Sequence, residues 1–301
     1  MSLPRTELRD PDAIGLAKSS DENILGLLLE KQTEALNAVH SALPQLAKGA
    51  SLIQKAIIEK RLIGYAGAGS AGLAALCDYL ELPGTFGYPV DRLRMLFAGG
   101  IDNLKSMKGS IEDSLEGGTN DFAASGLSEN DCLILISASG TTPYTLGVLN
   151  AAKAAGITTI GLANNPDTPL LHQSDVPILL QTQPEIIAGS TRLGAATAQK
   201  VALNMMSTLV ALRLGHAVRG HMVNLVADNE KLQIRATRII MDIAGCDIET
   251  AQFALKQTLG DVKVAILMVR DDLPVDIARQ KIAECDGNLR PLLDISTTSD
   301  T

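Results

Sequence analysis

The sequence is poor in aromatic residues and in positive charge. It contains no tryptophan, and aromatic residues make up 3% of its 301 residues. Lys and Arg number 26 against 34 Asp and Glu, so the formal net charge is −8 at pH 7. A chain of this charge, without rings on which bases could stack, is not expected to bind nucleic acid or an anionic membrane. An anionic ligand would have to be held by local groups against an unfavourable overall field.

Cysteine and histidine are few and widely spaced. The four cysteines lie at positions 77, 132, 246 and 285 and form no C-x-x-C pair. Zinc and redox motifs are therefore not supported, and buried free thiols are the expected state. His216 and His221 have no carboxylate partner at ligand spacing, which favours a structural role. We expect no metal site.

Long hydrophobic segments are also missing. No apolar run approaches the roughly 20 residues that span a bilayer. Residues 1–15 lack the apolar core of a signal peptide, so we expect the protein in the cytoplasm. With 46% apolar residues, the chain is long enough to form two domains and a large core.

Short apolar segments alternate with helical patterns through much of the chain. The run "CLILI" is apolar at every position, which is typical of a parallel sheet covered by helices on both faces. We therefore expect an α/β fold of three αβα layers. The expected strands lie within 61–67, 91–100, 131–137, 157–165 and 176–182, and the expected helices are 21–46, 51–60, 70–82, 142–156 and 194–215.

The pattern changes after about residue 230. Three short helical segments follow, and Asp247 fits the cap position of the second. We expect a small helical domain with its own core. The predicted organisation is an N-terminal helical arm at 1–45, a sheet domain at 46–230, a small helical domain at 231–293 and a disordered tail at 294–301.

Two turns rich in glycine and hydroxyl groups follow expected strands. They are "GAGSAG" at 67–72 and "SASGTT" at 137–142. Ligands of such sheets bind beyond the carboxyl ends of the strands, so both turns can face one crevice. Hydroxyls of Ser137, Ser139 and Thr142 could donate to a phosphate, while Gly140 lets the backbone approach closely. Alternatively, the second turn is only a hydroxyl-rich helix cap before Pro143.

The first turn also matches a dinucleotide-binding fingerprint, with glycines at 67, 69 and 72. That motif normally has an acidic residue about twenty positions later, at the end of the second strand. Here the strand "RLRMLFAGG" ends without one, and Asp91 precedes it instead. Nicotinamide binding is the less favoured alternative.

Glu81 and Glu112 are candidate acid–base groups. Glu81 is flanked by leucines and Pro83, which would desolvate its carboxylate, whereas Glu112 lies in a polar, glycine-rich loop. Two carboxylates in different surroundings can divide acid and base roles. The alternative is a pair of solvated surface glutamates, and sequence spacing does not say whether the two meet.

Taken together, these stretches resemble the sugar isomerase (SIS) domain family. More narrowly, they are similar to the N-acetylmuramic acid 6-phosphate etherases, whose relatives include the glucokinase regulatory protein. The similar segments follow the family's order from Thr6 to about Leu292. They are "TELRDPDAIGL", "GAGSAG", "LELPGTFG", "FAGG", "KGSIEDSLEGG", "SASGTTPY", "PEIIAGSTRLGAATAQKVALNMMST" and "MVNLVADNEKL".

The resemblance implies a reaction. Such etherases eliminate D-lactate from N-acetylmuramic acid 6-phosphate and then add water, giving N-acetylglucosamine 6-phosphate without a metal or an organic cofactor. It implies that Glu81 is the acid and Glu112 the base at C2, in a homodimer with sites near the subunit interface. The residues implied to bind the phosphosugar are Gly69, Ser70, Ser137, Ser139, Gly140, Thr141, Thr142, Ser190, Thr191 and Arg192.

Three departures from the family pattern each remove a cation. Leu73 and Thr141 stand where the family has arginine, and Gly194 stands where it has lysine. Arg192 remains, either as the surviving cation of the site or as part of a structural salt bridge. Two interpretations stay open: a divergent etherase, or an SIS protein that binds or isomerises another phosphosugar, in the extreme as a non-catalytic regulator.

Overall fold

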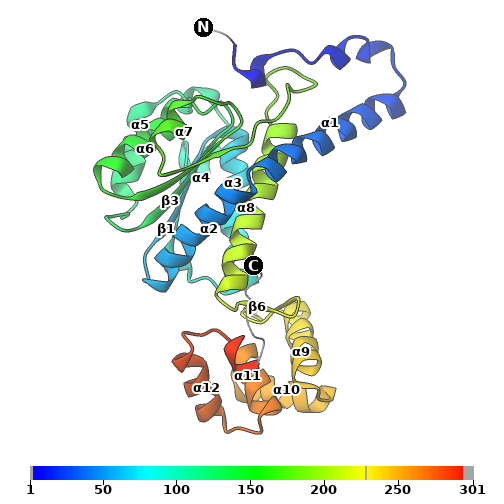
Figure 1. Cartoon of the computed structure of the whole chain (residues 1–301), viewed down its shortest axis with the longest axis vertical. Helices are drawn as coiled ribbons and strands as arrows, with labels where there is room; N and C mark the ends of the chain where they lie inside the picture. The colour runs from blue at the N-terminus through cyan, green and yellow to red at the C-terminus, as the bar shows by residue number, and fades with distance from the viewer. Residues whose placement is uncertain (1–2, 228, 294–301) are drawn as a thin grey trace. The chain divides into compact units, whose positions relative to one another are not determined.

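The computed structural model describes residues 3–227 and 229–293, and it divides into two compact units (Figure 1). The first unit comprises residues 1–79 and 91–207, and the second comprises 80–90 and 208–301. The second unit thus includes a segment near residue 85 and resumes at 208, whereas the sequence-based boundary lies at 230. The tail predicted at 294–301 lies outside the described residues.

The first unit is built on a five-stranded parallel sheet, as predicted. Its strand order is β2-β1-β3-β4-β5. The central strand β3 is buried along its whole length, which explains why its sequence is apolar throughout. The strands are β1 (Ile63–Gly67), β2 (Leu93–Phe97), β3 (Cys132–Ser137), β4 (Thr158–Ala163) and β5 (Val176–Leu179).

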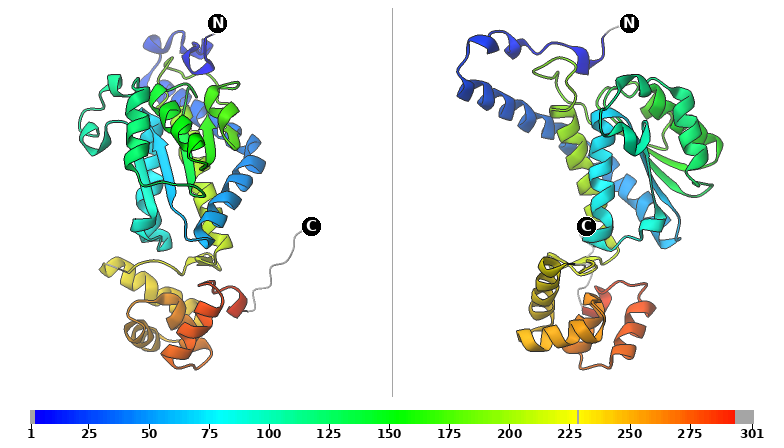
Figure 2. Two further views of the ribbon diagram at one scale, coloured as in Figure 1. Left: turned by 90° about the vertical axis from the view of Figure 1, so that its left-hand side faces the viewer. Right: turned by 180° about the vertical axis from the view of Figure 1, so that it is seen from behind.

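Helices cover both faces of this sheet, which confirms the three-layer expectation (Figures 1 and 2). One face carries α5 (Leu115–Ala124), α6 (Pro143–Ala154) and α7 (Pro169–Gln173). The other carries α2 (Leu43–Ile58), α3 (Gly69–Phe86) and α8 (Gly194–Arg213). The unit also contains α1 (Asp21–Ser41) and the short α4 (Gly100–Asn103).

The expected single helix at 21–46 was wrong. The chain forms two helices, with α1 ending at Ser41 and α2 beginning at Leu43. Pro44 lies in the first turn of α2, where its missing N–H group is tolerated, but it would break a continuous helix. The helix predicted at 51–60 is the second half of α2.

The second unit is helical and has its own core, formed largely by Ile239, Ile240, Ile266 and Leu267. The carboxylate of Asp247 accepts a hydrogen bond from the backbone N–H of Thr250, as predicted for a cap. Its elements are the hairpin β6 (Ala217–Val218) and β7 (His221–Met222), and helices α9 (Glu230–Ala244), α10 (Ile248–Gln257), α11 (Val262–Arg270) and α12 (Val275–Glu284).

Within the described ranges, none of the helices combines the length and the apolar character needed to cross a membrane.

Candidate active site at the carboxyl edge of the sheet

The two predicted turns follow neighbouring strands. Strands β1 and β3 pair in parallel, with Gly67 opposite Ile136. The strand order of the sheet reverses at this pair, and such a switch point is where open α/β sheets bind their ligands. The turns at 67–72 and 137–142 therefore lie side by side at the carboxyl edge.

The glycines of the first turn serve close packing between β1 and α3. A Cβ atom on Gly67 would lie 3.0 Å from the Cα atom of Gly72, and one on Gly72 would lie 2.7 Å from Cε2 of Phe97. Strand β2 ends at Phe97 and is followed by alanine and glycine, not by a carboxylate. Packing thus accounts for the glycine pattern without a dinucleotide.

Glu112 reaches the first turn from another loop. A Cβ atom on Gly69 would lie 2.7 Å from one carboxylate oxygen of Glu112 and 3.1 Å from the other. The backbone N–H of Tyr144, in the first turn of α6, donates to the carbonyl of Glu112 at 3.0 Å. Burial of the half-buried Glu112 carboxylate raises its pKa, and neighbouring Asp113 adds to the shift. This environment suits a general base.

The hydroxyl groups of the second turn converge. Oγ of Ser137 lies 2.8 Å from Oγ1 of Thr142, and Oγ of Ser139 lies within 3.4 Å of both. The backbone N–H of Gly140 donates to Oγ of Ser137, and that of Thr141 donates to Oγ of Ser139. The predicted phosphate-binding groups are thus brought together by one short loop.

The alternative interpretation of this turn was a helix cap made by its hydroxyl groups, but the side chain at the cap position does not make that hydrogen bond. Thr142 occupies the N-cap position of α6 but makes no capping hydrogen bond with its side chain. Its hydroxyl points to Ser137 instead, so the loop gathers hydroxyls near a helix N-terminus. Gly140 has a positive φ of 70°, and the side chain of Thr168 occupies the space that a Cβ atom would need.

Ser190, Thr191 and Arg192 lie in the loop before α8. Arg192 is exposed and forms no ion pair with any of the described residues, so the salt-bridge alternative has no support in this part of the chain. The loop is tied to the helix by Glu185, which is 5% exposed. Its carboxylate accepts hydrogen bonds from the backbone N–H groups of Gly194 and Ala195, at 3.0 and 2.8 Å.

Sequence analysis missed Glu185. Burial raises the pKa of Glu185, and the two backbone hydrogen bonds oppose that shift. A helix cap normally lies within three residues of the N–H group that it accepts from. Glu185 precedes its partners by nine and ten residues. No local spacing rule identifies such a cap.

The positions that lack family cations differ in their surroundings. Leu73 and Thr141 are exposed, whereas Gly194 is buried. A Cβ atom on Gly194 would lie 3.2 Å from Cβ of Ala35 and 3.3 Å from Oε2 of Glu185. Packing therefore restricts the side chain at 194 but not at the other two positions.

Glu81 and Ser70 lie on α3. Ser70 is half-buried in the first turn of the helix, beside Gly69. Glu81 comes twelve positions after Gly69 in the sequence, in the segment that belongs to the second unit. Its side chain is exposed and neighbouring Leu80 is 63% exposed, so the desolvated surroundings expected for Glu81 are not found.

This architecture, with its site at the strand ends, defines an α/β protein of the SIS domain class. The SIS domain family matches residues 104–213. A phosphoheptose isomerase from Francisella tularensis shares the fold with a TM-score of 0.51 and 16% identity, over 64% of this chain and 100% of that chain.

Similarity to two etherases is higher and nearly full-length. The N-acetylmuramic acid 6-phosphate etherase of Deinococcus radiodurans is 39% identical over 289 residues, which cover 96% of this chain and 95% of that protein. That of Vibrio atlanticus is 36% identical over 285 residues, or 95% and 93%. The chain therefore belongs to the N-acetylmuramic acid 6-phosphate etherase family, as its motifs indicated.

Proposed function

We propose that this chain is a carbon–oxygen lyase that cleaves the D-lactyl ether of N-acetylmuramic acid 6-phosphate, giving N-acetylglucosamine 6-phosphate and D-lactate. One observation supports the roles that we propose for individual residues. The carboxylate of Glu112 lies against Gly69 at the strand ends, and its backbone is bonded to the helix that follows the hydroxyl loop. A base and an anion-binding loop are therefore held by the same few elements.

The phosphate binds to neutral donors in this proposal. Three hydroxyl groups lie close together at the start of α6, those of Ser137, Ser139 and Thr142. There they can replace the water that solvates a phosphate. Arg192 supplies a cation from the neighbouring loop. The phosphate is remote from the reacting bonds, so its binding energy serves to hold the sugar in register.

Glu112 acts as the base of the elimination. The sugar ring opens to expose the C1 carbonyl, which acidifies the C2 proton. Glu112 removes that proton, the C2–H electron pair forms the C2=C3 double bond, and the C3–O bond breaks with its pair on the lactyl oxygen. The raised pKa of Glu112 makes it a stronger base at neutral pH than an ordinary carboxylate. Water then adds to C3.

Glu81 protonates the departing lactyl oxygen in this scheme. Glu81 is exposed on α3, in the segment that belongs to the second unit. We propose a homodimer in which this exposed Glu81 of one subunit serves the Glu112 site of the other. Since a charged phosphosugar does not cross membranes unaided, we place the reaction in the cytoplasm.

The missing cations support one alternative. The lactyl carboxylate is a second negative charge on the substrate, and the site lacks cations at positions 73, 141 and 194. A phosphosugar without that carboxylate carries one negative charge fewer for the site to neutralise, so their absence would weaken its binding less. Isomerisation of such a sugar would use the same phosphate loop and the same base.

The deciding experiment incubates the protein with N-acetylmuramic acid 6-phosphate and measures released D-lactate and exchange of the C2 proton with deuterium. Glu112→Gln should suppress both by about 10²–10⁴-fold. Glu116→Gln is the matched control, because Glu116 is an exposed glutamate nearby. Absence of both signals in the unmodified protein would contradict the proposed activity. Exchange on another 6-phosphosugar alone would favour the alternative.

A further inference from the structure

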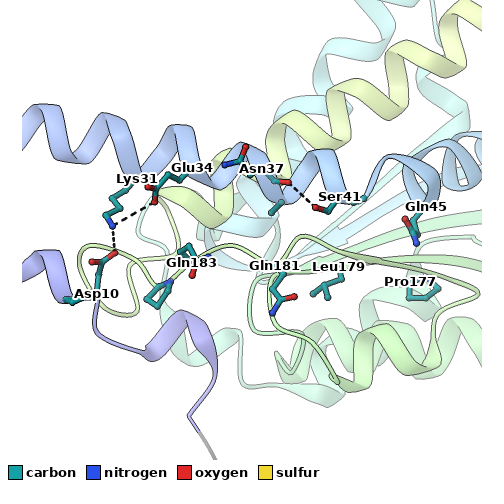
Figure 3. Close-up of a pocket in the computed structure, with 14 residues that line it drawn as sticks. Asp10, Lys31, Glu34, Asn37, Ser41, Gln45, Pro177, Leu179, Gln181 and Gln183 are labelled. Carbon is teal, nitrogen blue, oxygen red and sulfur yellow. Dashed lines mark hydrogen bonds and ion pairs between the residues drawn. The ribbon is translucent and has the colours of Figure 1, made fainter.

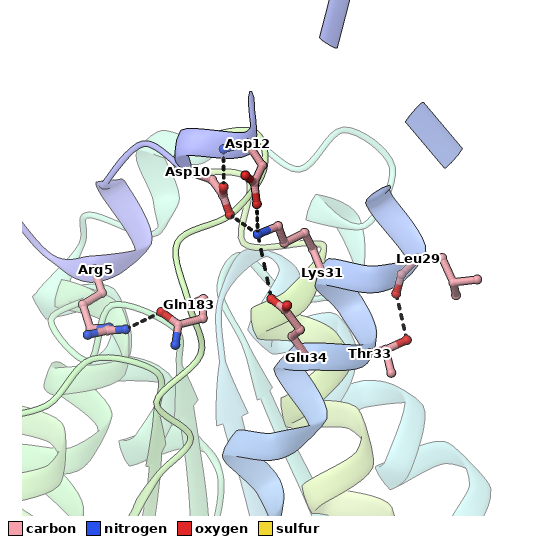
Figure 4. Close-up of polar contacts among 8 residues, drawn as sticks. All are labelled: Arg5, Asp10, Asp12, Leu29, Lys31, Thr33, Glu34 and Gln183. Atoms are coloured by element: carbon pink, nitrogen blue, oxygen red, sulfur yellow. Dashed lines mark hydrogen bonds and ion pairs between the residues drawn. The ribbon is translucent and has the colours of Figure 1, made fainter. Parts of the chain in front are cut away.

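A segment near the N-terminus crosses the loop that carries Arg192. We call residues 5–12 the strap. The backbone N–H of Gly189 donates to the carbonyl of Thr6 at 2.9 Å. The guanidinium of Arg5 donates to Oε1 of Gln183 at 2.7 Å, at the base of the same loop (Figure 4). The strap is thus bonded directly to one of the two loops assigned to the phosphosugar.

Thr6 also reaches the other loop, through one buried side chain. Asn165 follows β4, and its amide NH₂ donates both to Oγ1 of Thr6 at 3.1 Å and to the carbonyl of Ala138 at 3.0 Å. The backbone N–H of Thr6 donates back to Oδ1 of Asn165 at 3.4 Å. Ala138 lies between Ser137 and Ser139 in the hydroxyl loop.

Thr6 is therefore hydrogen-bonded directly to the Arg192 loop and, through Asn165, to the hydroxyl loop. It is 2% exposed and Asn165 is 4% exposed, so water does not replace these hydrogen bonds when they break. Among the described residues, no hydrogen bond joins loop 137–142 directly to loop 186–193. The short path from one to the other runs through Ala138, Asn165, Thr6 and Gly189.

The far end of the strap is fixed to α1. Nζ of Lys31 lies 2.6 Å from the carboxylate of Asp12 and 3.1 Å from that of Asp10, with Glu34 at 3.9 Å (Figure 4). Asp12 and Asp10 raise the pKa of Lys31, so the ammonium stays charged at neutral pH. The carboxylate of Asp10 is 3% exposed and is also bonded to the backbone N–H of Asp12.

A cavity lies beside this anchor. Its volume is about 900 Å³, and it is lined by Asp10 and Lys31 at one end and by Gln45 and Pro177 at the other (Figure 3). Within the strap only Thr6 and Asp10 are buried, and the polar contacts described above join both residues to the rest of the unit.

We propose that the strap couples the hydroxyl loop to the Arg192 loop, and that Thr6 is the positioning residue of this device. With the strap in place, the phosphate-binding hydroxyls and Arg192 are held at a fixed separation and engage one ligand together. The identity of the ligand rests on the function proposed above. The coupling between the loops does not depend on it.

The first test measures backbone hydrogen exchange in the full chain without ligand. Thr6→Val removes only the hydroxyl and leaves the NH₂ group of Asn165 short of an acceptor. Exchange should become about tenfold faster in both loops, the effect expected when one buried hydrogen bond is lost. Thr6→Ser should restore the slow exchange. Thr33→Val is the control, since Thr33 is an exposed threonine on α1.

A second variant tests the ion pairs that fix the far end of the strap to α1. Lys31→Met breaks the anchor without touching either loop, and it should also speed exchange in both loops. Faster exchange confined to one loop, or unchanged exchange in either variant, would overturn the coupling. These outcomes are independent of activity, so a failure of the proposed substrate leaves the test intact.

Steady-state kinetics with N-acetylmuramic acid 6-phosphate supply the readout that a purely structural role would not move. Thr6→Val should raise KM about tenfold and leave kcat within about threefold, because it loosens binding groups but not the base. Thr6→Ser should return KM to the original value. A fall in kcat at constant KM would contradict a positioning role for Thr6.

Discussion

Replacing Gly69 by alanine tests the position of the base most directly. Gly69 has a φ of +54°, and its missing side chain is the space in which the Glu112 carboxylate lies. An alanine would pay about 1–2 kcal/mol for the left-handed backbone. Its Cβ atom would also meet Oε1 of Glu112 at 2.7 Å, which forces the carboxylate to move. Because the carboxylate ends a flexible side chain, it can rotate away at little further cost.

The variant should therefore fold but lose the base. A stability loss of about 1–2 kcal/mol corresponds to a drop of about 2–8 °C in Tm for a unit of this size. Displacement of a reacting group by about 1 Å can cost ~10²-fold in rate. We expect C2 proton exchange, measured by NMR in deuterium oxide at a saturating concentration of the 6-phosphosugar, to fall about 100-fold.

The pH profile provides a second signature. Glu112 must be ionised to accept a proton, and burial holds its pKa above 4.5, so exchange falls as the pH drops through that raised pKa. Where Gly69→Ala displaces the carboxylate into a less buried position, its pKa falls, and this limb of the profile should shift to lower pH. Gly26→Ala is the control, because nothing lies within 4 Å of its new Cβ atom. Exchange in Gly69→Ala that stays near the original rate would refute the assignment of Glu112.

Two further predictions concern the phosphate loop and acid stability. Ser139→Ala should weaken binding of a 6-phosphosugar about 10- to 100-fold in calorimetry, because a hydrogen bond to a charged group is lost. Binding of the unphosphorylated sugar should not change. Equal losses for the two sugars would contradict the assignment of the phosphate loop. Burial, with a smaller effect of Lys263, lowers the pKa of His216 from 6.5 to about 4, so the unfolded chain binds the extra proton first as the pH falls. Stability should decrease by up to about 3 kcal/mol between pH 6.5 and 4, and His216→Leu, but not His40→Leu, should flatten that decrease in denaturant titrations.

The class of fold could be predicted from the sequence because parallel sheets leave a clear pattern. Apolar strands such as "CLILI", alternating with helices, indicate a sheet covered on both faces. Helix α11 was missed because "VKVAILMVR" is apolar at most positions, so its periodicity does not separate a buried helix from a strand. The break between α1 and α2 was missed although Pro44 marked it, because the apolar spacing continues across it.

The candidate site was predictable only in its local parts. The hydroxyl loop lies within six consecutive residues, and the rule that ligands bind at strand ends placed it beside the glycine turn. The approach of Glu112 to Gly69 depends on the path of the 42 residues between them, which no periodicity reports. The bond between Thr6 and Asn165 joins residues 159 positions apart, and Glu185 caps a helix from nine residues away.

The three missing cations do not have one cause. At position 194 the neighbours restrict a side chain, because a Cβ atom there would lie 3.2 Å from Cβ of Ala35 and 3.3 Å from Oε2 of Glu185, so one of them would have to shift. Leu73 and Thr141 are exposed, so packing would admit arginine at either position. Exposed charges contribute little to folding stability, so the packing of this chain does not explain the absence of arginine at these two positions. If the site binds as proposed, Arg192 is the remaining candidate cation for a second anionic group such as the lactyl carboxylate. We therefore predict that Arg192→Gln weakens binding of N-acetylmuramic acid 6-phosphate more than binding of N-acetylglucosamine 6-phosphate, and equal losses in calorimetry would contradict that role.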